Sequence, residues 1–250
     1  MSGDLKVSRL AGQAMAQAMY PYTFGIVSND HGMEGKGLGT GVGVVWRGTY
    51  LIATAKHVVK DTASQRIYYL LPQNTLRIEE SSASVAWTQV SWQPRCTLEN
   101  PRILHGDRDI AVILLPEQQE PAAKNHFYKL EESQASPAVG TNVGYMGYPV
   151  ASAQPLGKNY GAMPSYAFGH ICVANCKYDT RQEFAVRYEP GDDLDPHGFS
   201  GSGIWYSRST GNIWSPQVSL AGLVSNYYRR SQVLISCRIE ILTGFLAANL

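Results

Sequence analysis

The chain has few charged residues and few cysteines for its length. Only 16% of its 250 residues are charged, and the formal net charge is +1. This balance argues against a protein that binds nucleic acid through general electrostatic attraction, because such proteins carry a basic excess. The four cysteines are too few and too scattered for the disulfide framework of a small secreted protein, so we expect free thiols.

Long apolar runs are also missing. No segment reaches the roughly 20 apolar residues that a membrane-spanning helix requires. The first residues are not followed by the apolar core of a secretory signal. From these absences we expect a soluble cytoplasmic protein that binds neither a membrane nor a nucleic acid.

Turn-forming residues and tyrosine are abundant, with 24 Gly, 13 Pro and 15 Tyr. This composition favours many short strands joined by tight turns over a bundle of helices. Two stretches favour helix instead: residues 7–19, which have helix-forming composition, and residues 239–250, whose apolar residues lie near helical spacing. Residues 116–140 are rich in Pro, Glu and Gln and form the one plausible subdomain boundary.

A glycine-rich stretch at 196–203, Pro-His-Gly-Phe-Ser-Gly-Ser-Gly, places serines between glycines in a loop. Glycine lets the backbone approach a ligand closely, so consecutive amides can point at one spot. Ser200 and Ser202 both fit the position of a nucleophile. A serine hydroxyl attacks only when a base takes its proton and a third group orients that base.

Two other stretches supply the missing groups. Residues 51–59 read as a strand that ends in a small-residue turn carrying His57. In residues 107–115, Asp107 and Asp109 stand just before a run of apolar residues that predicts a buried strand. The glycines at 39–43 lack both the spacing and the following helix of a nucleotide loop, so we expect a strand there.

These stretches together resemble the trypsin-like serine proteases of the chymotrypsin fold. The family's histidine segment is matched by Thr-Ala-Lys-His-Val at 54–58, its aspartate strand by Asp-Ile-Ala-Val-Ile at 109–113, and its serine loop by residues 198–203. The motifs stand in the family's chain order, and the resemblance covers roughly residues 20 to 240. The chain resembles the bacterial branch without disulfides, the HtrA and V8-like proteases, more than it resembles the digestive enzymes.

The resemblance implies an all-β fold of two six-stranded antiparallel Greek-key barrels, with a short N-terminal helix and a C-terminal helix. It predicts a helical extension at 1–20, a first barrel at 21–120 and a second at 121–250, all within one protease domain. Expected strands include residues 22–28, 39–46, 50–54, 66–71 and 83–92 in the first barrel.

The resemblance also assigns roles. It implies a triad in which Ser200 is the nucleophile, His57 the base and Asp109 the orienting group, with Asp107 and Ser202 as rivals. The amides of Gly198 and Ser200 would form the oxyanion hole. Substrate would contact five residues near the loop: Leu194, Asp195, His197, Ser225 and Tyr227. The acidic residues at 192, 193 and 195 would attract a basic side chain, whereas Leu194 and Tyr227 would suit a small or medium apolar one.

Phe199 departs from the family pattern, because relatives often have Asp or Asn there. The ion pair that the digestive enzymes make on activation is therefore absent, and activation by N-terminal cleavage is not expected. One hypothesis is that a regulatory protein partner controls the loop. A zinc site at His170, Cys172 and Cys176 is disfavoured because a second ligand pair is lacking, and we expect no metal and no cofactor.

The sequence therefore predicts a serine endopeptidase that cleaves protein or peptide substrates through an acyl-enzyme intermediate. The alternative is a catalytically silent module that binds a peptide in its cleft.

Overall fold

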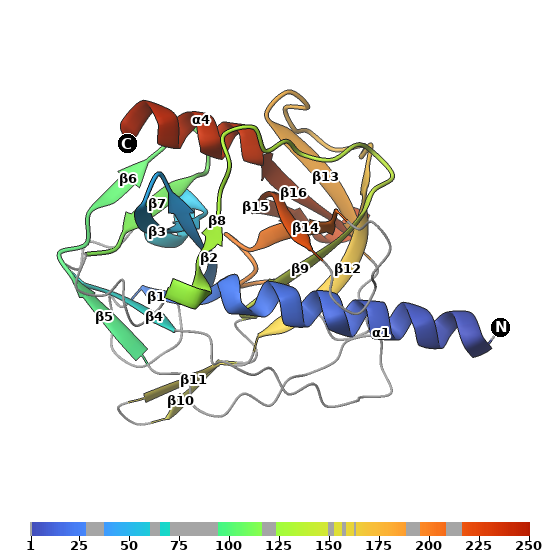
Figure 1. Cartoon of the computed structure of the whole chain (residues 1–250), viewed down its shortest axis with the longest axis horizontal. Coiled ribbons are helices and arrows are strands. Elements are labelled where there is room, and N and C mark those ends of the chain that lie inside the picture. Colours follow the sequence, from blue (N-terminus) through green and yellow to red (C-terminus); the bar gives the residue numbers. More distant parts are fainter. Residues whose placement is uncertain are drawn as a thin grey trace.

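A computed structural model shows two β-sheets packed together, with a helix along one side and another at the C-terminus (Figure 1). The described residues are 2–28, 38–60, 66–70, 95–116, 124–149, 153–156, 159–162, 164–188, 196–208 and 217–250. The expected all-β architecture of two packed sheets is confirmed.

The first sheet has eight strands in the order β5-β4-β1-β2-β3-β7-β6, with β8 beside β2. All its pairs are antiparallel except β2–β8. Its strands are β1 (Thr23–Ser28), β2 (Leu38–Trp46), β3 (Thr49–Thr54), β4 (Arg66–Leu70), β5 (Arg95–Glu99), β6 (Ile103–His105), β7 (Ala111–Leu114) and β8 (Tyr128–Lys129).

The second sheet is a closed six-stranded barrel in the order β12-β13-β16-β15-β14-β9. Its strands are β9 (Asn142–Gly147), β12 (Ser165–Cys172), β13 (Glu183–Tyr188), β14 (Gly203–Ser207), β15 (Val218–Tyr228) and β16 (Val233–Arg238). A separate hairpin consists of β10 (Ala153–Leu156) and β11 (Asn159–Ala162).

Helix α1 (Ser2–Met19) lies along the outside of the second barrel and leads through the short turn η1 (Tyr20–Tyr22) into β1 (Figure 1). Gly12 leaves room for the ring of Phe168, and Ala16 and Met19 are fully buried. The remaining helical elements are α2 (Lys56–Val59), η3 (Lys124–His126), η5 (Arg229–Ser231) and α4 (Ile239–Asn249). Among the described residues, no helix is both long and apolar enough to cross a membrane.

One hydrophobic core joins the two sheets and both long helices. Val44 of β2, Trp205 of β14 and Leu246 of α4 all belong to it, and each is fully buried. The indole of Trp205 stacks on the ring of Tyr22 at 5.6 Å between centroids. Burial of large side chains from both sheets in one cluster makes them a single body, which fixes the loops at their junction.

Several details differ from the sequence-based expectation. The N-terminal helix is longer than residues 7–19, and the first sheet is an eight-stranded half-barrel. The extra strand β8 fits because β1 pairs with β2 only as far as Val42, which leaves Val44 and Val45 to pair with β8. The predicted strand at 83–92 lies outside the described residues. The domain boundary at 120/121 stays a prediction.

Candidate active site

His57 lies just beyond the end of β3, where the chain turns into the single-turn helix α2. Ala55 is extended, with φ −73° and ψ 139°, and the amide of Val58 donates to the Ala55 carbonyl at 3.1 Å. The Lys56 ammonium donates to the Gly106 carbonyl at 3.0 Å. This bond ties the histidine turn to the segment that carries the aspartates.

Asp109 lies in the turn before β7, and the sheet register places it beside His57. Thr54 at the end of β3 pairs with Ala111 at the start of β7, so the two turns emerge side by side. The turn is closed by bonds from the Gly106 amide to the Ile110 carbonyl at 2.9 Å and from the Ile110 amide to the Arg108 carbonyl at 2.7 Å.

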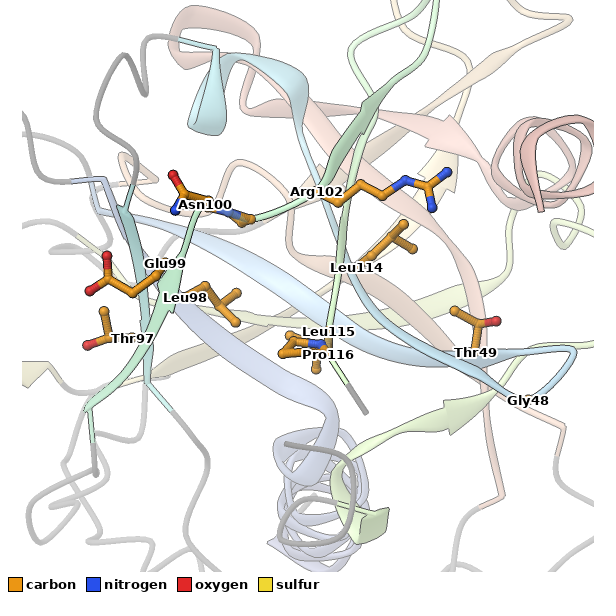
Figure 2. A pocket seen from close by; sticks show the side chains of 11 residues that line it. Gly48, Thr49, Thr97, Leu98, Glu99, Asn100, Arg102, Leu114, Leu115 and Pro116 are labelled. Carbon is orange, nitrogen blue, oxygen red and sulfur yellow. The ribbon is translucent and has the colours of Figure 1, made fainter. Parts of the chain in front are cut away.

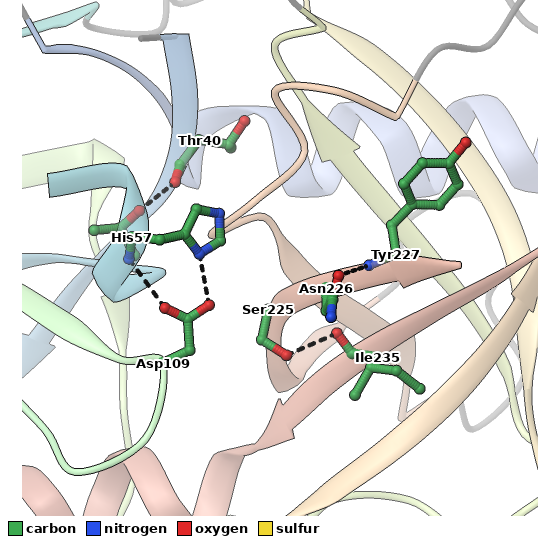
Figure 3. A network of polar contacts seen from close by, with 8 residues as sticks. Thr40, His57, Asp109, Ser225, Asn226, Tyr227 and Ile235 are labelled. Atoms are coloured by element: carbon green, nitrogen blue, oxygen red, sulfur yellow. Dashed lines mark hydrogen bonds and ion pairs between the residues drawn. The ribbon is translucent and has the colours of Figure 1, made fainter. Parts of the chain in front are cut away.

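The Asp109 carboxylate holds His57 with both of its oxygens (Figure 3). Oδ2 lies 2.7 Å from the ring atom Nδ1, and Oδ1 accepts the His57 backbone amide at 3.0 Å. The ring and the backbone of His57 are therefore oriented by one group. Asp107 is exposed and makes no described contact with His57, so the geometry favours Asp109 over Asp107.

The Asp109 carboxylate also raises the pKa of His57 above its ordinary value. The main cause is the hydrogen bond to Asp109, because it stabilises the protonated imidazole; the negative charge of the carboxylate adds to it, and partial burial opposes it. The His57 side chain is 49% exposed, so its free nitrogen Nε2 remains accessible.

The loop at 196–203, called the serine loop below, lies directly against the turn before His57. Gly201 has φ +85°, and a Cβ atom there would overlap the Thr40 carbonyl and the Thr54 hydroxyl and lie 2.9 Å from the Ala55 amide nitrogen. Only glycine allows this approach. Ser200, next to Gly201, therefore sits beside the segment that presents the imidazole.

Ser200 and Ser202 differ in access to solvent. Ser202 is fully buried, and its hydroxyl has no hydrogen-bond partner within the described part of the chain. Ser200 is partly exposed. A nucleophile must reach a substrate carbonyl, so the geometry favours Ser200.

The amides of the serine loop fall into two groups. Those of Phe199, Gly201 and Ser202 donate to backbone carbonyls at 2.8 to 3.0 Å. Those of Gly198 and Ser200 donate to no acceptor among the described residues. Gly198 has φ +100°, a conformation that suits glycine. Two free amides two residues apart match the arrangement of an oxyanion hole.

Three of the expected substrate-contacting residues lie within the described structure, and Leu194 and Asp195 lie outside it. Tyr227 packs between Tyr188 and His197, with ring centroids 6.3 Å apart in each case. Ser225 is buried, and its hydroxyl donates to the Ile235 carbonyl at 3.1 Å. The Ser225 side chain is therefore bonded within the barrel, which leaves its backbone as the part available for a substrate contact.

The profile of the trypsin-like peptidase domain family matches residues 39–213. The chain belongs to this family. Among solved structures, human heparin binding protein is 11% identical with TM-score 0.58, covering 92% of this chain and 91% of that one. A structure from work on the coupled folding and binding of the intrinsically disordered Sesbania mosaic virus VPg protein is 10% identical with TM-score 0.50, covering 90% of each chain. These likenesses show a chymotrypsin-like fold. No curated protein matches the sequence.

Phe199 occupies the position before Ser200 at which, by the resemblance, relatives often carry a polar residue. The side chain is 1% exposed and meets the ring of Tyr145 edge to face, with centroids 5.7 Å apart. It belongs to the second barrel's core with Ile204 and Val224. An aromatic ring thus anchors the serine loop where an ion pair anchors it in the digestive enzymes.

Replacing Phe199 with alanine is expected to lower the free energy of unfolding by about 3–5 kcal/mol, because it leaves a cavity in a packed core. Urea unfolding measures this change. Phe199→Leu, which keeps an apolar side chain, is the control and should lose less. A loss below about 1 kcal/mol for Phe199→Ala would mean that the ring does not anchor the loop.

Thr40 was missed by sequence analysis. It is fully buried in β2, and its hydroxyl and backbone bond to the serine loop. The glycines on either side, Gly39 and Gly41, were predicted only as part of a strand. In the structure a Cβ atom at these positions would overlap the side chains of Val58 and Ile52.

The described residues contain no group of three side chains that could hold a metal ion. Cys96, Cys172, Cys176 and Cys237 are all free thiols. Burial raises the pKa of the Cys237 thiol to about 12, which makes it a poor nucleophile.

A hollow of about 830 Å³ lies on the first sheet (Figure 2). Gly48, Thr49, Leu114 and Pro116 contribute to its lining. These residues stand at the ends of β3 and β7 opposite to those that lead to His57 and Asp109. The hollow is therefore separate from the candidate active site.

Proposed function

We propose that the chain is a serine endopeptidase that hydrolyses peptide bonds in protein substrates through His57, Asp109 and Ser200. The observation that carries this proposal is the pair of hydrogen bonds by which the two Asp109 carboxylate oxygens hold the ring and the backbone amide of His57. The serine loop packs against the turn that carries this histidine. The free amides of Gly198 and Ser200 give it further support.

In the first half of the reaction, Ser200 Oγ attacks the substrate carbonyl carbon and His57 Nε2 takes the hydroxyl proton. The Nδ1–H of the resulting imidazolium donates to Asp109 Oδ2, which stabilises the charge. The tetrahedral intermediate collapses, the C–N bond breaks, and Nε2 gives its proton to the leaving amine. An ester then joins the substrate to Ser200.

In the second half, a water molecule attacks the ester carbonyl and gives its proton to His57 Nε2. Collapse of this intermediate breaks the bond to Ser200, whose oxygen recovers the proton. In both halves the negative oxygen would accept hydrogen bonds from the Gly198 and Ser200 amides. One such donor contributes about 3 kcal/mol to catalysis.

For substrate binding we propose the free edge of β15. Strand β14 pairs with β15 only as far as Leu223, and the serine loop binds Val224. From Ser225 to Tyr228 no described strand pairs on that edge, so an extended peptide can pair there. The Tyr227 amide donates to Asn226 Oδ1 at 2.7 Å. Tyr227, braced by Tyr188 and His197, would narrow the adjoining pocket and favour a small or medium apolar side chain. Contacts by Leu194 and Asp195 stay predictions.

The test is cleavage of a fluorescently labelled unfolded protein. The expected result is release of fluorescent peptides, and it should stop after treatment with a fluorophosphonate that reacts with activated serines. Absence of cleavage and of phosphonate reaction, with peptide still bound, would identify the silent binding module instead.

The pH dependence of kcat/KM should show His57 as the base. Only neutral His57 can take the Ser200 proton, so activity is lost as pH falls through its pKa. Because Asp109 raises that pKa, the midpoint of the acid limb is expected above the ordinary histidine value of 6.5. Initial rates at low substrate concentration from pH 5 to 9 measure it; a midpoint below 6.5 would contradict the role of Asp109.

A cytoplasmic location is part of the proposal, and four unpaired thiols agree with a reducing compartment. Control by a regulatory protein partner and membership of the bacterial branch stay predictions.

A further inference from the structure

Thr40 makes four hydrogen bonds that converge on the serine loop and its surroundings. Its hydroxyl donates to the Gly198 carbonyl at 2.6 Å and accepts the Tyr148 amide at 2.9 Å. Its backbone amide donates to the Ser200 carbonyl at 2.9 Å, and its carbonyl accepts the Thr54 hydroxyl at 2.6 Å. Thr40 itself is fully buried.

The two bonds to the serine loop hold the carbonyls of the same residues whose amides are free. The Gly198 carbonyl is drawn toward β2 by the Thr40 hydroxyl, and the Ser200 carbonyl by the Thr40 amide. Each of these carbonyls shares its peptide group with the amide of the next residue, so Thr40 holds the Gly198–Phe199 and Ser200–Gly201 peptide groups. The free Ser200 amide lies in the peptide group between these two, and the free Gly198 amide lies in the one just before them. Their orientation therefore depends on a residue of the other sheet.

The backbone of Gly198 especially depends on a hydrogen bond that fixes the direction of its peptide groups. At φ +100° it has access to alternative backbone conformations at little cost, so its peptide groups can rotate. The neighbouring Phe199 ring anchors the loop by packing, which fixes position more than the direction of a peptide group. The Thr40 hydroxyl holds the carbonyl side of the Gly198–Phe199 peptide group, whose amide donates to the Pro196 carbonyl at 3.0 Å, so both ends of this peptide group are directed.

We propose that Thr40 is a positioning residue for catalysis, whose hydroxyl holds the Gly198 carbonyl so that the Gly198 and Ser200 amides stay preorganised for the oxyanion. This inference rests on the proposed function. Thr40 touches neither substrate nor reacting atoms, and it acts through the backbone of the serine loop. Its link to Thr54, three residues before His57, connects the same residue to the strand that delivers the base.

The test compares Thr40→Ala with Thr40→Ser. Alanine removes the hydroxyl, whereas serine removes only the methyl group, and both keep the backbone amide that binds Ser200. Valine is unsuitable because a methyl group at the hydroxyl position, 2.6 Å from the Gly198 oxygen, would clash. Thr23→Ala is a matched control, since Thr23 is also buried in the first sheet and its hydroxyl donates to the Met19 carbonyl at 3.1 Å.

The readouts are kcat and KM per phosphonate-titrated active site, and the affinity for a peptidyl boronate that mimics the tetrahedral intermediate. For Thr40→Ala we expect kcat and boronate affinity to fall together, by about 10- to 100-fold, somewhat less than when an oxyanion donor is deleted. KM should stay within about threefold, because ground-state binding is unaffected. Thr40→Ser should restore both values, and Thr23→Ala should lower the melting temperature alone.

The outcomes separate the two proposals. If the unmutated protein cleaves and Thr40→Ala keeps its kcat and boronate affinity, the positioning role is overturned and the proposed function stands. If Thr40→Ala loses only thermal stability, as Thr23→Ala does, Thr40 is structural and the inference is again wrong. An unmutated protein that neither cleaves nor reacts with the phosphonate overturns the proposed function, and the positioning role with it.

Discussion

Ser200→Ala is expected to lower kcat for peptide hydrolysis by about a million-fold, because the covalent route is lost along with the nucleophile. Residual activity above the uncatalysed rate would come from the oxyanion amides and substrate binding. The measurement is turnover of a fluorogenic peptide that the unmutated protein cleaves. Folding should be unaffected, since Ser200 is partly exposed.

Ser202→Ala is the matched control for this prediction. The Ser202 hydroxyl is fully buried without a hydrogen-bond partner among the described residues, so its removal should leave kcat unchanged and stability equal or higher. Loss of turnover in Ser202→Ala with retention in Ser200→Ala would reverse the assignment of the nucleophile.

Asp109→Asn is expected to lower kcat by about 10,000-fold, because an amide cannot hold His57 in the tautomer that leaves Nε2 free to accept a proton. It also removes the charge and hydrogen bond that raise the pKa of His57, so the acid limb of any remaining activity should move to lower pH. Turnover measured across the pH range reports both effects.

Asp107→Asn provides the comparison for Asp109. Asp107 lies two residues earlier, is exposed and makes no described contact with His57. Its replacement should change kcat by less than about threefold, as is usual for an exposed charge. Equal losses in the two variants would show that the general charge of this turn matters and that the specific contact to Nδ1 does not.

The positions of His57, Asp109 and Ser200 could be predicted from sequence because each stands in a local motif. The strand ending at Thr54 and the strand beginning at Ala111 are both short apolar runs, and their pairing brings the two turns together. The glycines around Ser200 likewise indicate a loop of unusual backbone conformation, which Gly198 and Gly201 confirm with positive φ.

Thr40 could not be predicted in the same way. Its role depends on a hydroxyl contact with Gly198, which is 158 residues away in sequence. A threonine in an apolar strand is an ordinary residue for a β-sheet, and nothing local marks it as functional. Phe199 presented a similar difficulty, since the sequence showed which ion pair is absent but not the aromatic core that replaces it.

Irregular parts of the fold were also beyond sequence analysis. Strands β6 and β8 have three and two residues, too few for a period-2 pattern to be visible. Helix α1 was expected at residues 7–19 and has 18 residues, and the packing of Gly12, Ala16 and Met19 holds its C-terminal half against the protein. The short strands are defined by their pairing with β7 and β2, and helices in proteins are stabilised mainly by tertiary packing.

The proposed chemistry is tested most directly by finding where a fluorophosphonate attaches to the unmutated protein. After labelling, digestion and mass spectrometry should place one phosphonate on the peptide that contains Ser200, with fragment ions locating it on Ser200 and not on Ser202. Labelling should decline below the pKa of His57, because the protonated imidazole no longer activates the hydroxyl. Absence of an adduct, or an adduct on another residue, would contradict the proposed mechanism.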